Sequence, residues 1–420
     1  MPGDDPESPR GGCRAHADRH GRWWCPSSGQ CHADVVQSIA ILDQEYPRFS
    51  EAELATRHLR IAEALGEAGR EHLVVWGANR AGSGVQWLTR WPVTAEAAAI
   101  VTPDRQDALF VQHHNHLPLA RRLATEAEVG WQPATIDAAL EELARRGARP
   151  DSVAYIGPLN VPAWRALTAR FGEPLDLNRA YTRLRQLKSA EEIAWLRLGA
   201  HLTDLGMSAL RDGLRPGLTE RELGDLVERA YVAHGAINGL HYFGVTPMDA
   251  PSVGVPGQFP STRRVRPRDV VFAEITAIFW DYPGQVLRTF TLGEPTALYR
   301  ELHTAADAAF DAIVAVLRDG VTPAEIVAAA GVIEDAGFTT IDDLLHGYGG
   351  GYLPPVLGSA SRPAGPLPTE PLRAGMTVVV QPNVTTPDGT AGVQTGELVM
   401  ITETGAESLH DQPRGLTVLG

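Results

Sequence analysis

The chain has 420 residues, of which 44% are hydrophobic and 21% are charged, which is enough for one or two globular domains with cores of their own. Its formal net charge of -14 argues against a nucleic acid as partner, because phosphate binding requires clustered Lys and Arg. The chain also lacks an apolar run of about 18 residues and the apolar stretch of a signal peptide, so we expect a cytoplasmic protein outside the membrane.

All cysteines lie near the start of the chain, at Cys13, Cys25 and Cys31, and this usage fits a reducing cytoplasm. The spacing from Cys25 to Cys31 and His32 leaves a metal clip as an alternative. Zinc sites usually combine two close pairs of ligands, however, and only one pair is present. We therefore expect residues 1–35 to form a flexible leader.

Apolar residues recur at helical spacing from Ala52 to Leu65, and short apolar runs follow at Leu73–Trp76 and Ala108–Val111. These patterns predict one helix and then buried strands. The alternation of helices and strands indicates an α/β domain, which we place at residues 36–183.

A second domain is expected over residues 184–420. Periodicity is lost from Pro174 to Leu187, and then Ser189 and Glu192 stand at the offset of a capping box that begins a long helix. Later segments repeat one pattern of capped helices and paired strands, with helices beginning at Thr219 and Thr322 and strands at Val270–Ile278, Val286–Leu292, Met376–Gln381 and Gly392–Thr402. Two α-β-β halves of this kind would face each other across a central cleft.

The linker at residues 184–193 reads LRQLKSAEEI and is similar to the LRxIKSxxEI linker of the creatinase, aminopeptidase P and methionine aminopeptidase family. Further similarities lie at residues 271–290, 346–353, 374–382 and 392–405, so the resemblance covers roughly residues 50–410. It implies an α/β (α+β) fold in which a small creatinase-type domain precedes a pita-bread domain with pseudo-twofold halves. It also implies a homodimer.

The family holds two metal ions with Asp, Asp, His, Glu and Glu, and the matching positions here are Glu274, Gln285, His346, Gln381 and Gly396. A glutamine amide is neutral and glycine has no side chain, so bridging carboxylates are missing. The resemblance therefore implies a divergent member without the dinuclear centre, and we expect no metal and no other cofactor.

Three neighbouring positions bear on this expectation. Gly257 and Leu353 stand where the family has a proton-transferring and a substrate-side histidine. Glu397 adjoins Gly396, but neighbouring side chains in a strand point to opposite faces, so Glu397 is expected to point away from the cleft.

The chemistry that remains centres on His346 and Glu274. His346 is the best proton shuttle in the cleft, with a structural histidine as the alternative. Glu274 lies in an otherwise apolar strand, where a buried carboxylate must be paired, hydrogen-bonded or protonated. We assign proton transfer to His346, with Glu274 orienting or charging it, and substrate binding to three neutral amides, Gln285, Gln381 and Gln394.

Further candidates surround these residues. His241 is a candidate replacement for the histidine missing at Gly257, with a core histidine as the alternative. Tyr348 and Tyr352 flank three glycines and are candidate walls of the pocket, with ordinary loop packing as the alternative. Trp87 and Arg90 lie in a turn that resembles the family's substrate-contacting turn, and the resemblance implies that they reach the partner subunit's cleft.

Residues 112–116 read QHHNH, which suggests a metal tract. They follow a predicted strand, in which consecutive side chains alternate between faces, so we expect a surface or subunit-interface role instead.

We predict a metal-independent hydrolase that cleaves a carbon–nitrogen bond of a small polar molecule, as creatinases and ectoine hydrolases in the family do. One alternative is a non-hydrolytic acid–base enzyme of specialised metabolism, such as an isomerase, lyase, decarboxylase or cyclase. Another is an inactive binding module. A metal-dependent Xaa-Pro aminopeptidase fits the ligand positions least well.

Overall fold

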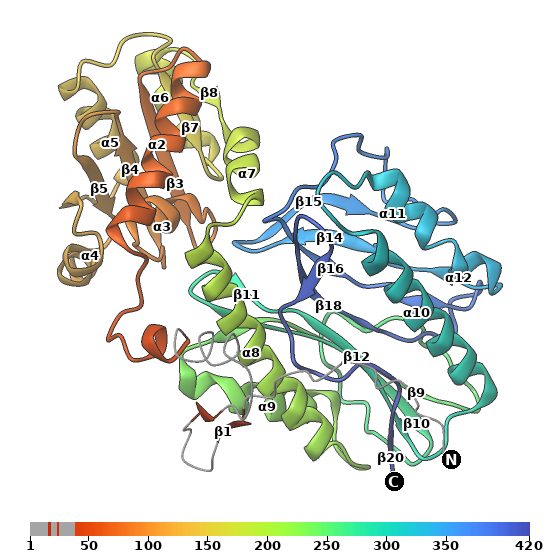
Figure 1. Cartoon of the computed structure of the whole chain (residues 1–420). Coiled ribbons are helices and arrows are strands. Elements are labelled where there is room, and N and C mark those ends of the chain that lie inside the picture. The colour runs from red at the N-terminus through yellow and green to blue at the C-terminus, as the bar shows by residue number, and fades with distance from the viewer. Residues whose placement is uncertain (1–15, 18–22, 25–37) are drawn as a thin grey trace, which may run out of the picture.

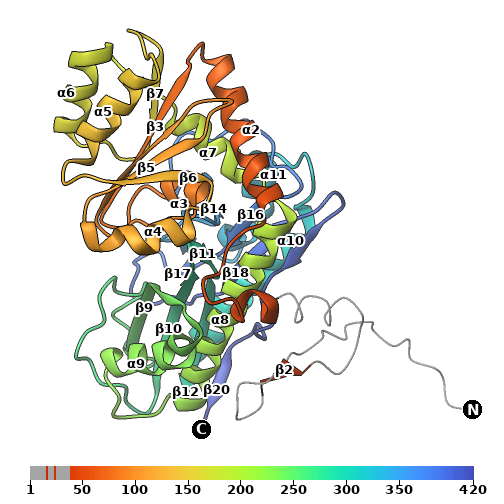
Figure 2. The same ribbon diagram turned by 90° about the vertical axis from the view of Figure 1, so that its left-hand side faces the viewer.

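The computed structural model describes residues 16–17, 23–24 and 38–420, most of which belong to two separate β-sheets and their helices (Figure 1, Figure 2). His16–Ala17 (β1) pairs antiparallel with Trp23–Trp24 (β2). The rest of the expected leader, including its three cysteines, lies outside the described residues.

The first sheet has six strands in the order β6-β5-β4-β3-β7-β8. The strands are β3 (His72–Ala78), β4 (Glu96–Val101), β5 (Asp107–Val111), β6 (Ala127–Trp131), β7 (Val153–Ile156) and β8 (Leu175–Asp176). The central strand β3 pairs antiparallel with β4 and parallel with β7, so the sheet is mixed. The strands predicted at Leu73–Trp76 and Ala108–Val111 are confirmed.

Helices cover both faces of this sheet (Figure 1). The helices are α2 (Glu51–Glu67), α3 (Gly84–Thr89), α4 (Leu117–Leu123), α5 (Thr135–Arg145) and α6 (Val161–Phe171). Leu73 and Val75 pack toward α2 and α3, whereas Val74 and Trp76 pack toward α5 and α6. Alternate side chains of β3 thus pack against the helices on the two faces of the sheet, as expected of a sheet covered on both sides.

The helix at the expected domain boundary was not predicted. Residues Asn178–Gln186 form α7, although the sequence lacks helical periodicity there. Tyr181 is the only buried residue of this helix, so its core contact is too small to produce an apolar repeat. The expected boundary between residues 183 and 184 falls inside α7.

The second sheet has ten strands, with the path β11-β10-β12-β18-β16-β14-β15 and three strands attached to its sides. The strands on the path are β10 (Asp269–Phe279), β11 (Tyr282–Pro283), β12 (Val286–Leu292), β14 (Leu345–Tyr348), β15 (Tyr352–Leu357), β16 (Thr377–Val380) and β18 (Gly396–Ile401). The attached strands are β9 (Ile237–Pro247), β19 (Ala406–Ser408) and β20 (Thr417–Leu419). A separate pair joins β13 (Thr339–Thr340) to β17 (Val384–Thr385).

Two helix groups pack on this sheet (Figure 1). They comprise α8 (Ala190–Gly213) and α9 (Glu220–Tyr231), and then α10 (Ala297–Val316), α11 (Pro323–Ala329) and α12 (Val332–Asp335). The capping box predicted at Ser189 is present, and the capped helices predicted at Thr219 and Thr322 also begin with capping boxes. Among the described residues, we find no helix with the length and hydrophobicity needed to cross a membrane.

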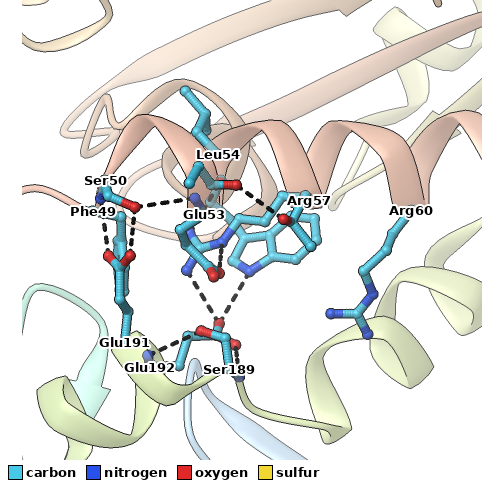
Figure 3. A network of polar contacts seen from close by, with 12 residues as sticks. Phe49, Ser50, Glu53, Leu54, Arg57, Arg60, Ser189, Glu191 and Glu192 are labelled. Carbon is cyan, nitrogen blue, oxygen red and sulfur yellow. Dashed lines mark hydrogen bonds and ion pairs between the residues drawn. The ribbon is translucent and has the colours of Figure 1, made fainter.

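A buried polar network joins the two sheet layers at the start of α8 (Figure 3). Arg57 of α2 donates to Glu53 at 2.7 Å and lies 3.3 Å from Glu192 of α8. The Tyr282 hydroxyl and the Trp87 indole also donate to Glu192, at 2.9 and 3.3 Å. These contacts tie the first sheet's helices to α8 and to β11.

Candidate active site

Glu274 projects from β10 on the same face as Val270 and Phe272, which pack in an apolar core. It is 6% exposed. The Gln285 amide nitrogen donates to Glu274 Oε1 at 2.6 Å and reaches Gln381 Oε1 at 3.3 Å. Gln285 lies directly before β12 and Gln381 directly after β16, so three strands bring these side chains together.

Burial and the nearby carboxyl groups of Asp342 and Asp343 raise the pKa of Glu274 to about 8. The Gln394 amide partly opposes this rise. No arginine or lysine is among the groups that shift this pKa. At neutral pH Glu274 is therefore chiefly a carboxylic acid, which can donate a proton.

His346 lies in β14, between β15 and β16, and is buried. Burial lowers the pKa of His346 to about 4, although the Gly347 carbonyl opposes the change. His346 Nδ1 lies 3.1 Å from that carbonyl oxygen, which can only accept a hydrogen bond. His346 is thus a neutral imidazole with the proton on Nδ1, and its Nε2 carries the lone pair.

Two tyrosines enclose the His346 ring. Tyr352 stacks on it with ring centroids 4.2 Å apart, and Tyr348 meets it edge-on at 5.3 Å. Tyr348 is buried, whereas Tyr352 is 55% exposed. Tyr352 therefore separates His346 from solvent and forms the outer wall of the site.

The sequence analysis missed Asp342 and Asp343, which precede β14. The Tyr352 hydroxyl and the Gln381 amide each donate to Asp343 at 3.2 Å. Burial and the adjacent Asp343 raise the pKa of Asp342 to about 7. The pattern that could have identified them in the sequence is two consecutive acidic residues shortly before His346.

Gln394 also lies at this site and is 1% exposed. Its backbone exchanges hydrogen bonds with the Thr289 hydroxyl. Its amide nitrogen and oxygen make no hydrogen bond of ordinary geometry, although the side chain is close enough to lower the pKa of Glu274. An amide buried in this way is available to a ligand.

His241 does not join this group. It faces α9 from β9, where its Nε2 lies 2.7 Å from the Tyr231 hydroxyl and its Nδ1 contacts the Leu240 carbonyl. In the β9–β10 pairing His241 stands opposite Ile275, one residue from Glu274, so the two side chains point to opposite faces. The proposed replacement for a catalytic histidine is therefore not supported, and His241 is a hydrogen-bonded core residue.

Trp87 and Arg90 are likewise occupied within their own chain. Trp87 donates to Glu192, and Arg90 donates to the Phe49 carbonyl at 3.1 Å and to Glu51 at 2.9 Å. Both side chains are buried. They hold the first sheet's helices in place, and neither contacts Glu274 or His346.

The remaining positions of the resemblance do not fit a dinuclear metal centre. A Cβ at Gly396 would lie 2.6 Å from the Val380 oxygen and 2.9 Å from Gln381 Cα, so no side chain fits there without movement of β16. Glu397 is occupied elsewhere, because Arg288 Nη2 donates to it at 2.6 Å. In the described part of the chain no group of three or more His, Cys, Asp or Glu side chains is arranged to hold a metal ion.

The histidine tract differs from its prediction. His114–His116 form a short 3-10 helix (η1), so the side chains do not alternate as in a strand. The rings of His113 and His116 lie 5.2 Å apart, and His114 meets Trp131 edge-on. His113 and His114 are exposed, which agrees with a surface position.

Comparisons with known proteins agree with this architecture. Uncharacterized peptidases of Staphylococcus saprophyticus and Staphylococcus aureus are 26% and 25% identical to the chain over 235 residues, 56% of its length. The match covers 65% of each relative, slightly less than two thirds. The Xaa-Pro dipeptidase of Bacillus anthracis matches 87% of this chain and 100% of its own, with a TM-score of 0.75 and 19% identity.

The dipeptidase PepE of Mycobacterium ulcerans has a TM-score of 0.74 at 24% identity, covering 88% of this chain and 99% of its own. These structures share the fold, so the expected architecture of an α/β domain followed by a pita-bread domain is confirmed. The sequence profile of metallopeptidase family M24 matches residues 194–403, half of the chain. The chain therefore belongs to metallopeptidase family M24.

Proposed function

We propose that this protein is a metal-independent enzyme that hydrolyses a carbon–nitrogen bond of a small polar molecule. The observation that carries the proposal is the 2.6 Å hydrogen bond from the Gln285 amide to the buried Glu274 carboxyl, at the two positions where the resemblance implies metal-ligating aspartates. Burial raises the pKa of Glu274 to about 8. A carboxyl kept neutral at pH 7 is suited to donate a proton to a leaving group.

The neutral imidazole of His346 supplies the complementary group. Its Nε2 accepts a proton from a water molecule, whose oxygen attacks the substrate carbon. As the carbon–nitrogen bond breaks, the Glu274 carboxyl donates its proton to the departing nitrogen. The two protons are later re-equilibrated with solvent, so the site returns to its starting state.

The amides position the substrate and stabilise charge. Gln285 already donates to Glu274 and Gln381 to Asp343, whereas Gln394 has both amide atoms available. A neutral buried donor, such as the amide of Gln394, stabilises a developing oxyanion without a cation. Because Glu274 is hydrogen-bonded to Gln285, we assign it the role of an acid and no longer that of orienting or charging His346.

The names of related structures, together with the description of the family as metallopeptidases, favour a competing function, that of a metal-dependent Xaa-Pro peptidase. In support of that function, three carboxyl groups do lie near one another, those of Glu274, Asp342 and Asp343. The steric block at Gly396 opposes the full ligand set, and the amides of Gln285 and Gln381 stand where two of the carboxylate ligands are implied.

Metal content and turnover together test the proposal. Protein purified without chelator and then loaded with manganese, cobalt or zinc is expected to bind well below one ion per chain. It should convert a member of a panel of amides, amidines and N-substituted amino acids equally well with and without EDTA. One or two tightly bound ions, with Xaa-Pro cleavage that EDTA abolishes, would establish the peptidase instead.

Heavy-oxygen water separates hydrolysis from other acid–base chemistry, because a hydrolytic product carries the label. His346→Asn should abolish turnover while leaving the protein folded, and the exposed His114→Asn serves as the matched control. Full activity in His346→Asn would contradict the mechanism.

A further inference from the structure

The turn between β14 and β15 consists of three glycines that join the two sides of the candidate site. Gly349, Gly350 and Gly351 all have positive φ, at 121°, 70° and 111°, a conformation that other residues adopt only with strain. The strand before the turn carries His346, and the residue after it is Tyr352, whose ring stacks on His346. The position of this turn therefore sets the Tyr352 ring relative to His346.

The turn is held by residues outside its own sheet. Arg185 of α7 donates through one nitrogen, Nη1, both to the Gly350 carbonyl and to the Ser83 hydroxyl, the latter at 2.9 Å. The Arg185 guanidinium also lies 4.3 Å from the Tyr181 ring centroid. Lys188 also lies against the turn, because a Cβ at Gly349 would lie 2.7 Å from Lys188 Cε.

A second turn supports the first. Trp280 and Asp281 connect β10 to β11 and both have positive φ, at 46° and 79°, which is the conformation of a two-residue hairpin turn. The Asp281 carbonyl accepts from the Gly350 amide at 3.2 Å. The Gln86 side chain of α3 in turn donates to the Trp280 carbonyl at 3.0 Å.

Both turns thus depend on side chains of the first sheet's layer and of α7, and the network around Glu192 fixes that layer against α8 (Figure 3). Arg185 joins three parts of the structure through one side chain. It contacts Ser83 beside α3, Tyr181 of α7, and Gly350 in the turn between β14 and β15.

We propose that Arg185 is a positioning residue, which holds the glycine turn so that Tyr352 covers His346. An effect of Arg185 on turnover rests on the proposed function, whereas its effect on the position of Tyr352 does not. Loss of Arg185 releases the Gly350 carbonyl, the hairpin becomes mobile, and His346 becomes exposed to solvent.

The test uses the full-length protein and needs no substrate. Nuclear magnetic resonance follows the His346 ring signal at fixed pH, assigned by its disappearance in His346→Asn, and hydrogen exchange follows the Gly350 amide. In Arg185→Gln the His346 signal should lose the ring-current shift from Tyr352, and the Gly350 amide should exchange at least about tenfold faster.

Arg183→Gln is the matched control, since Arg183 lies in the same helix but is exposed and pairs with exposed Glu370. It should leave both signals unchanged, and Tyr352→Ala should reproduce the loss of the ring-current shift. Should Arg185→Gln fail to fold, Arg185→Lys carries the test, because it keeps the charge but cannot reach both oxygens equally well. An unchanged His346 signal and Gly350 exchange rate in a folded Arg185 variant would overturn the proposal, even if turnover is lost.

Discussion

The Gln285 amide nitrogen donates to Glu274 Oε1 at 2.6 Å, and both side chains are buried between β10 and β12. An amide next to a carboxyl group leaves that group without a counter-charge. Desolvation and the nearby Asp342 and Asp343 therefore keep the Glu274 proton in place. This hydrogen bond occupies the two positions at which the family resemblance implies metal-ligating aspartates.

The first prediction concerns stability as a function of pH. The pKa of Glu274 is raised from 4.5 to about 8, so its contribution to stability is complete below pH 4.5 and is lost as the pH rises to about 8. Glu274→Gln has no such loss. Its free energy of unfolding should therefore rise relative to that of the wild type, by up to about 4 kcal/mol, as the pH increases across this range. Urea unfolding at several pH values measures the difference, and exposed Glu63→Gln should show no comparable trend.

The second prediction concerns the rate of turnover as a function of pH. The reaction needs His346 neutral and Glu274 protonated, so kcat/KM should fall below about pH 4 and above about pH 8. Asp342→Asn removes a neighbouring charge and should move the alkaline limit to lower pH, whereas exposed Asp335→Asn should not. An alkaline limit that stays in place would contradict the role of Asp342.

The third prediction concerns the close packing at Gly396. Gly396→Ala places a Cβ 2.6 Å from the Val380 oxygen, so β16 must move or the protein must lose stability. We expect a loss of about 1–3 kcal/mol in the free energy of unfolding. Gly405→Ala, where a Cβ meets only Thr402 Oγ1 at 4.0 Å, should cost much less. Equal losses of stability in the two variants would show that the closeness of β16 to Gly396 does not determine the cost.

The fourth prediction concerns the network in Figure 3. Glu192→Ala removes the buried carboxylate that pairs with Arg57 across the interface and accepts from Tyr282, so that Arg57 keeps only Glu53 as a charged partner. Breaking a buried pair of this kind costs about 3–5 kcal/mol, which thermal and urea unfolding can measure. Glu191→Ala is a useful comparison, because Glu191 bonds to exposed Ser50 and its loss should cost less. The reverse order of stability would contradict this account.

Much of this fold was predictable from local sequence. The capping boxes at Ser189, Thr219 and Thr322 begin helices as expected, because the signal for a cap lies within four residues. The strands at Val286–Leu292 and around Glu274 were predicted because they are rich in β-branched and aromatic residues. The short helix α7 was missed, since its single buried residue leaves no periodic pattern.

The sequence by itself determined which residue types occupy the cleft: neutral amides at Gln285 and Gln381, a carboxyl group at Glu274, and a histidine at His346. Only the tertiary structure decided how these groups behave. It turned His241 toward Tyr231, because strand register and not residue type sets the direction of a side chain. It also placed Asp342 beside Glu274, and the pKa of a buried acid depends on neighbours that are far away along the chain.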